Sequence, residues 1–259
     1  MNISKVLTAL EQFAPLPLQE DYDNVGLQIG LTEEQEVTGA LLCLDVTPDI
    51  VDEAASVGAN LIVAHHPLLF RAPRTITNSD YVGRCCLQAI RQRVAIYAAH
   101  TNLDNARGGV NFRAAELLGL KDVEFLKPLN REDGGSGCVG MLPAPMNEEE
   151  FLQQVKQTFG LQYVRHNALT GLMINRVAFC GGSGSFLIED AVCTGADVFI
   201  TGEVGYHHWF EAEKKIRLIE AGHYETERHV IDLLHDILHT ALPELPLYKT
   251  RLNTNPIIY

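Results

Sequence analysis

The stretch ALLCLDVTPDIVDEAASVGANLIVAHHP, residues 40–67, decides the fold of this chain. The apolar runs at its two ends have the composition of buried strands. The residues between them carry the signals of a helix, with Thr47 as N-cap, Pro48 at the first helical position and Gly58 as the stop. A strand, a helix and a second strand in this order form a β-α-β unit with parallel strands. The stretch therefore predicts an α/β fold.

The second strand of this unit runs into two adjacent histidines. Side chains alternate between the faces of a strand, so His65 and His66 would point in opposite directions if the strand continued. Pro67 stops the strand, and its ring biases His66 toward an extended conformation. We therefore expect the strand to finish before the histidines, so that both imidazoles lie on the turn beyond its carboxyl end.

The second half of the chain repeats this plan. Residues 177–203 align without gaps with residues 40–66, and each segment reads as strand, turn, helix, Gly-Ala and strand. Further on, residues 217–227 align with residues 94–104, and each contains a histidine followed four residues later by an acid. The matched pairs are His100 with His223 and Asp104 with Glu227. The chain is therefore predicted to contain an internal pseudo-repeat.

Polar side chains stand at the carboxyl ends of the predicted strands, where parallel α/β sheets bind their ligands. They are His65, His66, His100, Asp104, Glu203, His223 and Glu227. Imidazoles and carboxylates are the usual protein ligands of Zn, Mn, Fe and Co. A lone histidine at a strand end is more often a hydrogen-bonded surface residue, but this set exceeds the needs of one tetrahedral ion. It suits two ions bridged by a carboxylate.

The remaining histidines and one glycine-rich turn have weaker patterns. We expect a solvated or packing role for His229, His235 and His239 on a C-terminal helix, and no partner pattern accompanies His166. The adjacent His207 and His208 either support a metal site or pack on the surface. The glycines of residues 181–185 could cradle a phosphate. No Gly-Lys-Ser/Thr follows them, so a tight strand-to-helix turn is the simpler interpretation.

Composition predicts two domains. Residues 129–140, rich in charge and glycine, are the expected boundary or hairpin-like connector. They would separate an N-terminal α/β domain, residues 1–128, from a C-terminal α/β domain, residues 141–259. The second domain would end with an amphipathic helix over residues 226–242 and an extended tail that could return to the first domain. The predicted apolar stripe of that helix consists of Val230, Leu233, Leu234, Ile237 and Leu238.

Overall composition narrows the class of protein. The chain has 259 residues, 46% of them apolar and 20% charged, which is typical of globular proteins. The net charge of −13 argues against binding to nucleic acid or anionic membrane, both of which favour basic surfaces. No apolar run reaches the ~18 residues of a membrane span, and no secretory signal is visible, so we expect a cytoplasmic protein. The six cysteines form no Cys-x-x-Cys pair, which argues against a zinc finger.

Five motifs in order resemble the Nif-three-like family. They are DYDNVGLQIG (21–30), ANLIVAHHPLLF (59–70), HTNLD (100–104), ADVFITGE (196–203) and EAGHYETER (220–228). The resemblance implies two related α/β domains with a dinuclear metal site in the cleft between them. It also implies a homo-oligomer, a toroidal hexamer built as a trimer of dimers with sites facing its cavity.

The same resemblance implies the roles of individual residues. Carried over by motif, the metal ligands would be His65, His66, Asp104, His223 and Glu227. Glu227 would bridge two divalent ions (Zn, Fe or Mn), and His100 is a candidate for proton transfer. The implied function is a metal-dependent hydrolase of a small-molecule substrate, either a nucleotide (GTP by the family's usual designation) or another phosphorylated compound. The alternative is a non-catalytic metal-binding scaffold, metal chaperone or regulatory partner.

Overall fold

Two compact units, each with its own sheet, make up the chain. Unit 1 runs from Met1 to Leu103 and resumes from Val230 to the C-terminal end, and unit 2 comprises Asp104–His229. The computed structural model describes residues 1–31, 35–129, 133–168 and 171–258. The protein is therefore a mixed α/β fold with two sheets, as the sequence predicted.

The division between the units differs from the one expected from composition. Composition places it at residues 129–140, of which 130–132 lie outside the described residues. In the structure the chain leaves unit 1 after Leu103 and returns to it at Val230. The chain returns to unit 1 because the apolar stripe of the C-terminal helix packs into the core of that unit.

In chain order, unit 1 contains α1 (Ile3–Phe13), a short 3-10 helix η1 (Leu16–Leu18), β1 (Gly26–Ile29), β2 (Ala40–Cys43), α2 (Pro48–Ser56), β3 (Leu61–Ala64), α3 (Tyr81–Gln92), β4 (Ala95–Ala98), α4 (Thr101–Asp104, whose last residue opens unit 2), α10 (Val230–Ala241) and β11 (Leu247–Lys249). Its sheet has the strand order β1-β4-β3-β2-β11. The pairs β11–β2, β2–β3 and β3–β4 are parallel, and β1 is antiparallel to β4.

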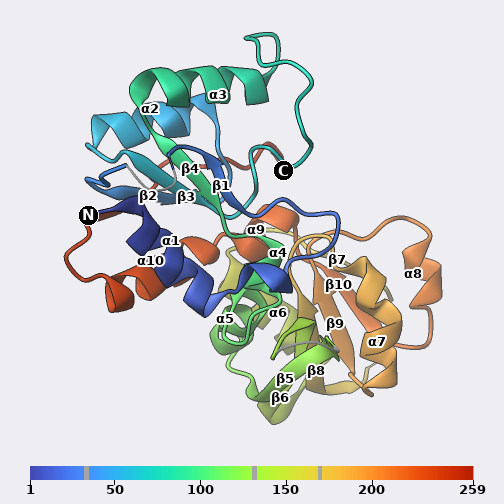
Figure 1. Ribbon diagram of the computed structural model, residues 1–259. Coiled ribbons are helices and arrows are strands. Elements are labelled where there is room, and N and C mark those ends of the chain that lie inside the picture. The colour runs from blue at the N-terminus through green and yellow to red at the C-terminus, as the bar shows by residue number, and fades with distance from the viewer. Residues whose placement is uncertain (32–34, 130–132, 169–170, 259) are drawn as a thin grey trace. The chain divides into compact units, whose positions relative to one another are not determined.

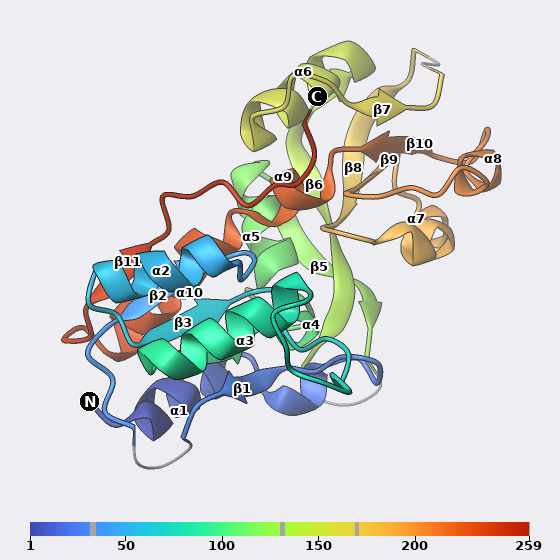
Figure 2. The same ribbon diagram turned by 90° about the horizontal axis from the view of Figure 1, so that it is seen from above.

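Helices cover both faces of this sheet (Figure 1). Helices α2 and α3 lie side by side over one face, and α1 and α10 lie side by side over the other. Figure 2 shows α2 and α3 in front of β2 and β3. The side chains of Leu41 and Cys43 belong to the core that contains α2 and α3. Leu42 lies between them and is fully buried toward the opposite face, because side chains alternate along a strand.

The first β-α-β unit forms as the local sequence signals predicted. The hydroxyl oxygen of Thr47 accepts a hydrogen bond from the N–H of Ile50 at 3.3 Å, and Pro48 is the first helical residue of α2. Gly58, with φ of +79°, lies just after the helix, where a left-handed residue favours glycine. Strand β3 ends at Ala64, so the two histidines begin the turn instead of extending the strand. This confirms the expected position of the strand end.

In chain order, unit 2 contains α5 (Val110–Leu117), β5 (Lys121–Pro128), β6 (Gly135–Asn147), α6 (Glu148–Phe159), β7 (Arg165–His166), β8 (Met173–Cys180), a 3-10 helix η2 (Ser185–Leu187), α7 (Ile188–Cys193), β9 (Val198–Thr201), α8 (His208–Glu211), β10 (Arg217–Glu220) and α9 (His223–Glu227). Its sheet has the strand order β5-β6-β8-β9-β10-β7, with β8, β9 and β10 parallel.

Both faces of the second sheet are also packed. Helices α5 and α6 contribute to a core with Val177 and Phe179 of β8. Helix α7 contributes to a second core with Ala178 and Cys180 of the same strand. The alternation of these four residues shows why residues 177–180 form a continuous apolar run, because a stretch of strand that is buried on both faces has no polar side.

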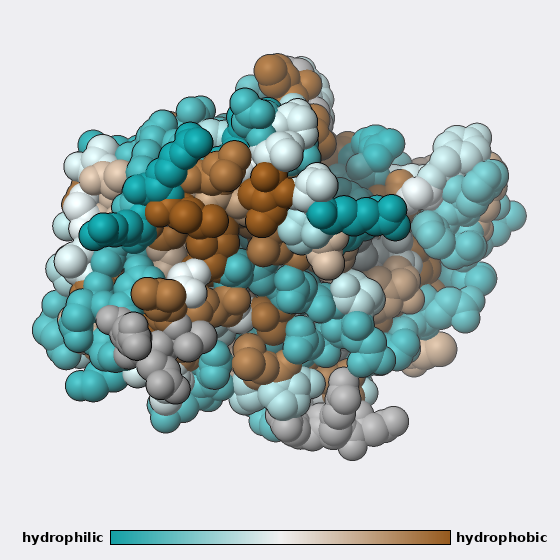
Figure 3. All heavy atoms as spheres, turned by 45° about the horizontal axis from the view of Figure 1, so that its top comes forward, coloured by the Kyte–Doolittle hydropathy of each residue, from teal (hydrophilic) through white to brown (hydrophobic). Residues whose placement is uncertain are grey.

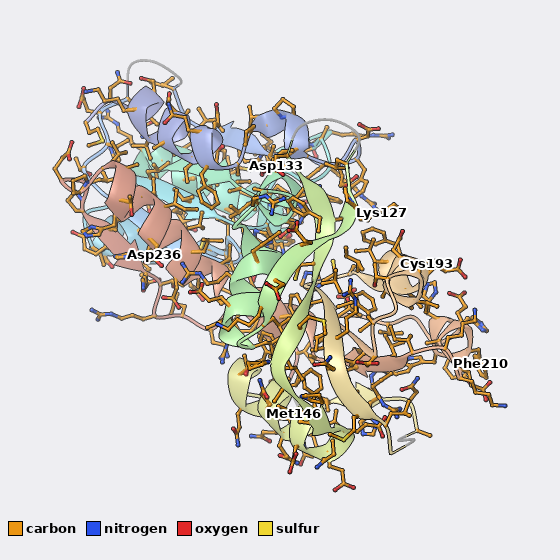
Figure 4. The ribbon with its side chains drawn as sticks, turned by 90° about the horizontal axis from the view of Figure 1, so that it is seen from below. Lys127, Asp133, Met146, Cys193, Phe210 and Asp236 are labelled. Atoms are coloured by element: carbon orange, nitrogen blue, oxygen red, sulfur yellow. The ribbon has the colours of Figure 1, made fainter. Side chains whose placement is uncertain are left out.

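The described part of the glycine-rich segment expected as a connector belongs to a β-hairpin. Strands β5 and β6 pair antiparallel, with Pro128 opposite Gly135. Figure 4 shows β6 as one long strand that runs from the region of the labelled Asp133 to the labelled Met146. Residues 135–140 are therefore part of a sheet. Of the two roles that composition allowed, the hairpin is the one observed, and no change of unit occurs there.

The registers of the two sheets confirm the internal repeat. In unit 1, Ala40 pairs with Leu61, and in unit 2, Val177 pairs with Val198. These are the residues that the ungapped alignment matches. In each unit a further parallel strand, β4 or β10, then lies beside the second strand of the repeat.

The two halves differ by one residue at the critical strand end. Ala99 and Ala221 occupy equivalent positions, because each donates its N–H to the last residue of the neighbouring parallel strand. His100 follows Ala99 directly, whereas Gly222 stands between Ala221 and His223. Gly222 has φ of +81°, a conformation that favours glycine, and it is the N-cap residue that precedes helix α9.

The C-terminal helix is shorter than the sequence suggested. Residues 223–227 form the separate helix α9, in which the Thr226 hydroxyl donates to the carbonyl of Gly222 at 2.7 Å, and α10 begins only at Val230. All the residues predicted for its apolar stripe are buried: Val230, Leu233, Leu234, Ile237 and Leu238. The tail then adds β11 to the sheet of unit 1, with Leu247 opposite Ala40.

The surface carries apolar patches, brown in Figure 3, between polar regions in teal. Large exposed apolar side chains occur in both units, for example Ile90 in unit 1 and Phe210 in unit 2. Among the described residues, no helix has both the length and the apolar character needed to cross a membrane.

Candidate metal site

Three histidines of unit 1 gather where β3 and β4 end. Ligand-capable atoms of His65, His66 and His100 all lie within 4.8 Å of one another. The turn after β3 is held in place by the backbone, because the N–H groups of His65 and His66 donate to the carbonyls of Cys43 and Leu44 at 3.1 and 2.9 Å. His65 is fully buried, and the other two imidazoles are half-buried.

In each of these imidazoles, Nδ1 is held by an oxygen acceptor. Nδ1 of His65 donates to the carbonyl of Ala99 at 2.7 Å. His66 and His100 make the same kind of bond to carboxylates, Nδ1 to Asp45 Oδ1 at 2.7 Å and Nδ1 to Asp23 Oδ1 at 2.8 Å. An imidazole that carries its proton on Nδ1 presents the lone pair on Nε2. This is the arrangement in which histidines bind metals, so the donor set fits a divalent ion.

The two carboxylates are fixed in turn by hydroxyl groups. Oδ2 of Asp45 accepts from the Thr254 hydroxyl at 2.6 Å, and Oδ2 of Asp23 accepts from the hydroxyl of Thr101 and, at 3.0 Å, from its N–H. Burial by itself would raise the pKa of both carboxyls. The hydrogen bonds and the neighbouring imidazoles outweigh burial, so they lower the pKa of Asp45 and hold that of Asp23 at about 2.

Unit 2 contains a corresponding arrangement around His223. Its Nδ1 lies 2.8 Å from Oε1 of Glu203, and its Nε2 lies 3.1 Å from Oε2 of Glu227. The Ser183 hydroxyl donates to Oε2 of Glu203 at 2.6 Å. Burial alone would raise the pKa of Glu203, but the bonds from Ser183 and His223 lower it below its ordinary value. Glu227 is itself buried.

Glycines make the space in which α9 presents its two ligand-capable residues. A Cβ atom at Gly182, where φ is +57°, would lie 2.2 Å from Oε1 of Glu227 and 3.2 Å from Nε2 of His223. A Cβ at Gly202 would lie 2.9 Å from the Cα of His223 and 2.8 Å from the hydroxyl oxygen of Thr226.

The glycine-rich turn of residues 181–185 is thereby accounted for as a structural turn. The N–H of Gly181 donates to Oδ1 of Asn111 at 3.0 Å, and the N–H of Gly182 donates to the Thr226 hydroxyl at 3.1 Å. The N–H of Gly184 donates to the hydroxyl of Thr201 at 2.9 Å. Because side chains of this chain take these donors, the turn does not present them as a phosphate cradle.

Asp104 is the last residue of α4 and the first of unit 2. Its side chain is half-buried, and its carbonyl accepts from the side-chain amide of Asn111 at 3.1 Å. Within unit 1, the structure thus brings together His65, His66 and His100, and within unit 2 it brings together His223 and Glu227.

Two residues of the site were missed by sequence reasoning. Asp45 lies just after β2, at the same carboxyl edge of the sheet as the histidines, so its position was the available signal. Asp23 lies in the DYDNVG motif, but it is 77 residues from His100, and nothing in the sequence around it indicates that His100 is its partner. The hydroxyl donors Thr101, Ser183 and Thr254 were also missed, because hydroxyl residues are common in turns.

Five other histidines make structural contacts elsewhere in the chain. His229 is buried and uses Nε2, not Nδ1, to donate to the carbonyl of Val110 at 3.0 Å. His208 pairs with Glu211 of its own helix at 2.8 Å, and the ring of His207 contacts Tyr206. The rings of His235 and His239 stack on one another along α10. Among the described residues, none of these histidines belongs to a ligand group of three.

A sequence profile of the family described as Duf34/NIF3 (NGG1p interacting factor 3) matches residues 1–256. A Clostridium perfringens protein named GTP cyclohydrolase 1 type 2 homolog is 35% identical over 233 residues, covering 89% of this chain and 88% of that protein. A Bacillus cereus protein related to NIF3 superposes with a TM-score of 0.91 at 25% identity, and a hypothetical protein of Staphylococcus aureus with 0.92 at 28%. Both structural alignments cover 100% of this chain and 99% of the other. The family profile spans nearly the whole sequence and the fold agrees with it, so this chain belongs to the Duf34/NIF3 family.

Proposed function

We propose that the chain binds two divalent metal ions, Zn, Fe or Mn, through His65, His66, Asp104, His223 and Glu227, with Glu227 as the bridging ligand. The observation that carries this proposal is the shared anchoring of the imidazoles. In His65, His66 and His223, Nδ1 is held by a carbonyl or carboxylate oxygen, which leaves Nε2 as the ligand nitrogen. Such anchoring sets the tautomer and restricts the rotation of the ring before a metal arrives.

The path of the chain supports the inclusion of ligands from both units. The chain leaves unit 1 through α4, and the proposed ligand Asp104 is the residue at that crossing. It returns to unit 1 at Val230, three residues after the proposed ligand Glu227. Both crossings therefore occur next to proposed ligands.

We further propose that the bound ions serve a hydrolase acting on a nucleotide or another phosphorylated small molecule. The name of the Clostridium perfringens relative supports GTP as the first candidate. Bound divalent ions would supply Lewis-acid activation of water and neutralise negative charge on the substrate. His100 is suited to accept and return a proton at Nε2, because the Asp23 carboxylate at Nδ1 stabilises the imidazolium that forms.

The test has two parts. Elemental analysis of purified protein gives the identity and stoichiometry of the metal, and a dissociation constant follows from competition with a chromophoric chelator. Turnover of GTP and of a phosphoester panel is then compared between wild type, Glu227→Ala and the control Glu213→Ala, whose side chain is exposed in unit 2. Loss of metal and activity in Glu227→Ala alone supports the proposal. Equal activity in all three proteins contradicts it.

The same experiments distinguish the non-catalytic alternative. Tight, stoichiometric metal without turnover of any compound in the panel would favour a scaffold, metal chaperone or regulatory partner.

A homohexamer is the assembly that we propose, and light scattering on the purified protein gives its mass directly. A monomeric mass would contradict that assembly without affecting the metal proposal.

A further inference from the structure

The C-terminal tail reaches the hydrogen bonds that support His66. After β11, the tail has no regular secondary structure as far as Ile258. It is first held by the N–H of Thr250, which donates to the carbonyl of Leu42 at 3.0 Å. The carboxylate of Glu53 then accepts from the Thr250 hydroxyl and from the N–H of Arg251. Further along, the Thr254 hydroxyl donates to Oδ2 of Asp45 at 2.6 Å. All these residues belong to unit 1.

Asp45 uses its two oxygens for two different partners. Oδ1 accepts from Nδ1 of His66 at 2.7 Å, while Oδ2 accepts from Thr254. The carboxylate torsion of an aspartate is intrinsically broad, so one hydrogen bond to the imidazole leaves the group free to rotate. A second hydrogen bond, on the opposite oxygen, removes that freedom. The orientation of the imidazole then depends on both contacts.

The same three-part arrangement occurs at two other proposed site histidines. Thr101 donates to Asp23, which holds His100. Ser183 donates to Glu203, which holds His223. Its recurrence at three imidazoles argues that the hydroxyl is part of how each carboxylate is positioned. The arrangement at His66 differs in one respect, because its hydroxyl comes from the C-terminal tail, 209 positions from Asp45 in the chain. The corresponding separations at the other two carboxylates are 78 and 20 positions.

We propose that Thr254 is a positioning residue for His66, and that docking of the C-terminal tail and metal binding at His66 are therefore coupled. The coupling part of this inference rests on the proposed metal site. A docked tail fixes Asp45 and orients the imidazole for a divalent ion, so tail docking strengthens metal binding. Because coupling between two binding events is reciprocal, a bound ion also strengthens tail docking. A segment held by few contacts is the part of a fold that opens most easily, so this coupling can be measured.

The experiment compares three variants with the wild type. Thr254→Val removes the hydroxyl at nearly constant shape, and Thr254→Ser restores a hydroxyl. Thr250→Val is the matched control, because it removes a threonine hydroxyl from the same tail at Glu53 instead of Asp45. The first readout is the Nδ1–H proton resonance of His66 in metal-free protein, assigned with His66→Gln. The second is the Zn²⁺ dissociation constant from chelator competition, and the third is amide hydrogen exchange of residues 252–257 with and without Zn²⁺.

We expect Thr254→Val to shift or broaden the His66 resonance and to weaken Zn²⁺ binding roughly 10-fold, the lower end of the range for outer partners of metal ligands. Thr254→Ser should restore both, and Thr250→Val should change both much less, because it leaves the bond between Thr254 and Asp45 in place. Zn²⁺ should slow exchange of the tail in the wild type but not in Thr254→Val. In an Asp45→Ala background, Thr254→Val should have no further effect, because the hydroxyl acts through that carboxylate.

An unchanged His66 resonance in Thr254→Val overturns the proposal, as does an equal change in Thr250→Val or a full additional loss in the Asp45→Ala background. If wild-type protein binds no Zn²⁺, the proposed function and the coupling fail together. The positioning role of Thr254 is still decided in that case by the resonance of metal-free protein.

Discussion

Gly182 leaves the space that the carboxylate of Glu227 occupies, since a Cβ atom at this glycine would lie 2.2 Å from Oε1 of Glu227. The clash is with the end of a flexible side chain and not with backbone. An alanine can therefore be accommodated if the carboxylate moves. We expect this movement to reduce metal affinity more than it reduces the stability of the fold.

We predict that Gly182→Ala weakens Zn²⁺ binding at least about 10-fold, by analogy with other disturbed metal-ligand supports. The control is Gly195→Ala, which has a similar positive φ of +70° but nothing within 4 Å of the added methyl. Both variants carry the backbone cost of alanine at positive φ, about 1–2 kcal/mol of unfolding free energy. Chelator competition and urea unfolding separate the two effects. Equal Zn²⁺ affinities for the two variants would count against the role of Gly182.

Removal of the Glu203 carboxylate tests the anchoring of His223. In Glu203→Ala the imidazole loses the acceptor that fixes its Nδ1 proton, so the ring can rotate and adopt the other tautomer. We expect metal affinity to fall about 10- to 100-fold with little change in thermal stability of the metal-free protein. Glu213→Ala, an exposed acid of the same unit, should bind metal like the wild type. A Glu203→Ala protein with wild-type affinity would show that this bond is incidental.

Acid should weaken the contact between Asp23 and His100. The pKa of Asp23 is lowered from its ordinary 3.8 to about 2, so folding favours the ionised carboxylate. Its contribution to the free energy of unfolding is present above pH 3.8 and is lost as the pH falls through about 2. Urea unfolding of wild type and Asp23→Asn from neutral pH downward measures this, and the stability difference should shrink in that window. A difference that stays constant to the lowest pH would contradict this assignment.

Metal removal should lower thermal stability. An ion that binds only the folded chain adds about 2.7 kcal/mol to the unfolding free energy at 100 times its dissociation constant. Treatment with a chelator should therefore lower the melting temperature, and Zn²⁺ should restore it in a concentration-dependent way. Glu227→Ala should show a much smaller response because it lacks the proposed bridging ligand. An equal response in that variant would place the stabilising ion elsewhere.

In unit 2, a buried ion pair between Arg217 and Glu148 joins the start of strand β10 to the start of helix α6. Both side chains are almost fully buried, at 5% and 4% exposure, and the guanidinium also donates to the carbonyl of Asn167 at 2.9 Å. Glu148→Ala leaves the guanidinium buried without this carboxylate, so we expect a loss of about 3–5 kcal/mol of unfolding free energy. Glu149→Ala, at an exposed neighbouring position, should cost far less. Chemical unfolding of the two variants makes the comparison.

Much of the fold follows from signals that are local in sequence. The cap at Thr47, the stop at Pro67 and the apolar stripe of α10 all act within a few residues, and each appears where the pattern placed it. The internal repeat was also readable, because two copies of one strand-helix-strand pattern must keep similar spacing. The division into units was not, since composition marks a glycine-rich turn equally well whether it joins domains or two strands of a hairpin.

The sequence by itself determined an α/β fold with a repeated strand-helix-strand plan and histidines at the carboxyl ends of its strands. Only the tertiary structure decided what holds those histidines. Asp23 meets His100 across 77 positions, and Thr254 meets Asp45 across 209. A hydrogen bond requires two groups within about 3 Å. For residues so far apart in the chain, that distance is set by how the sheet, the helices and the tail pack together.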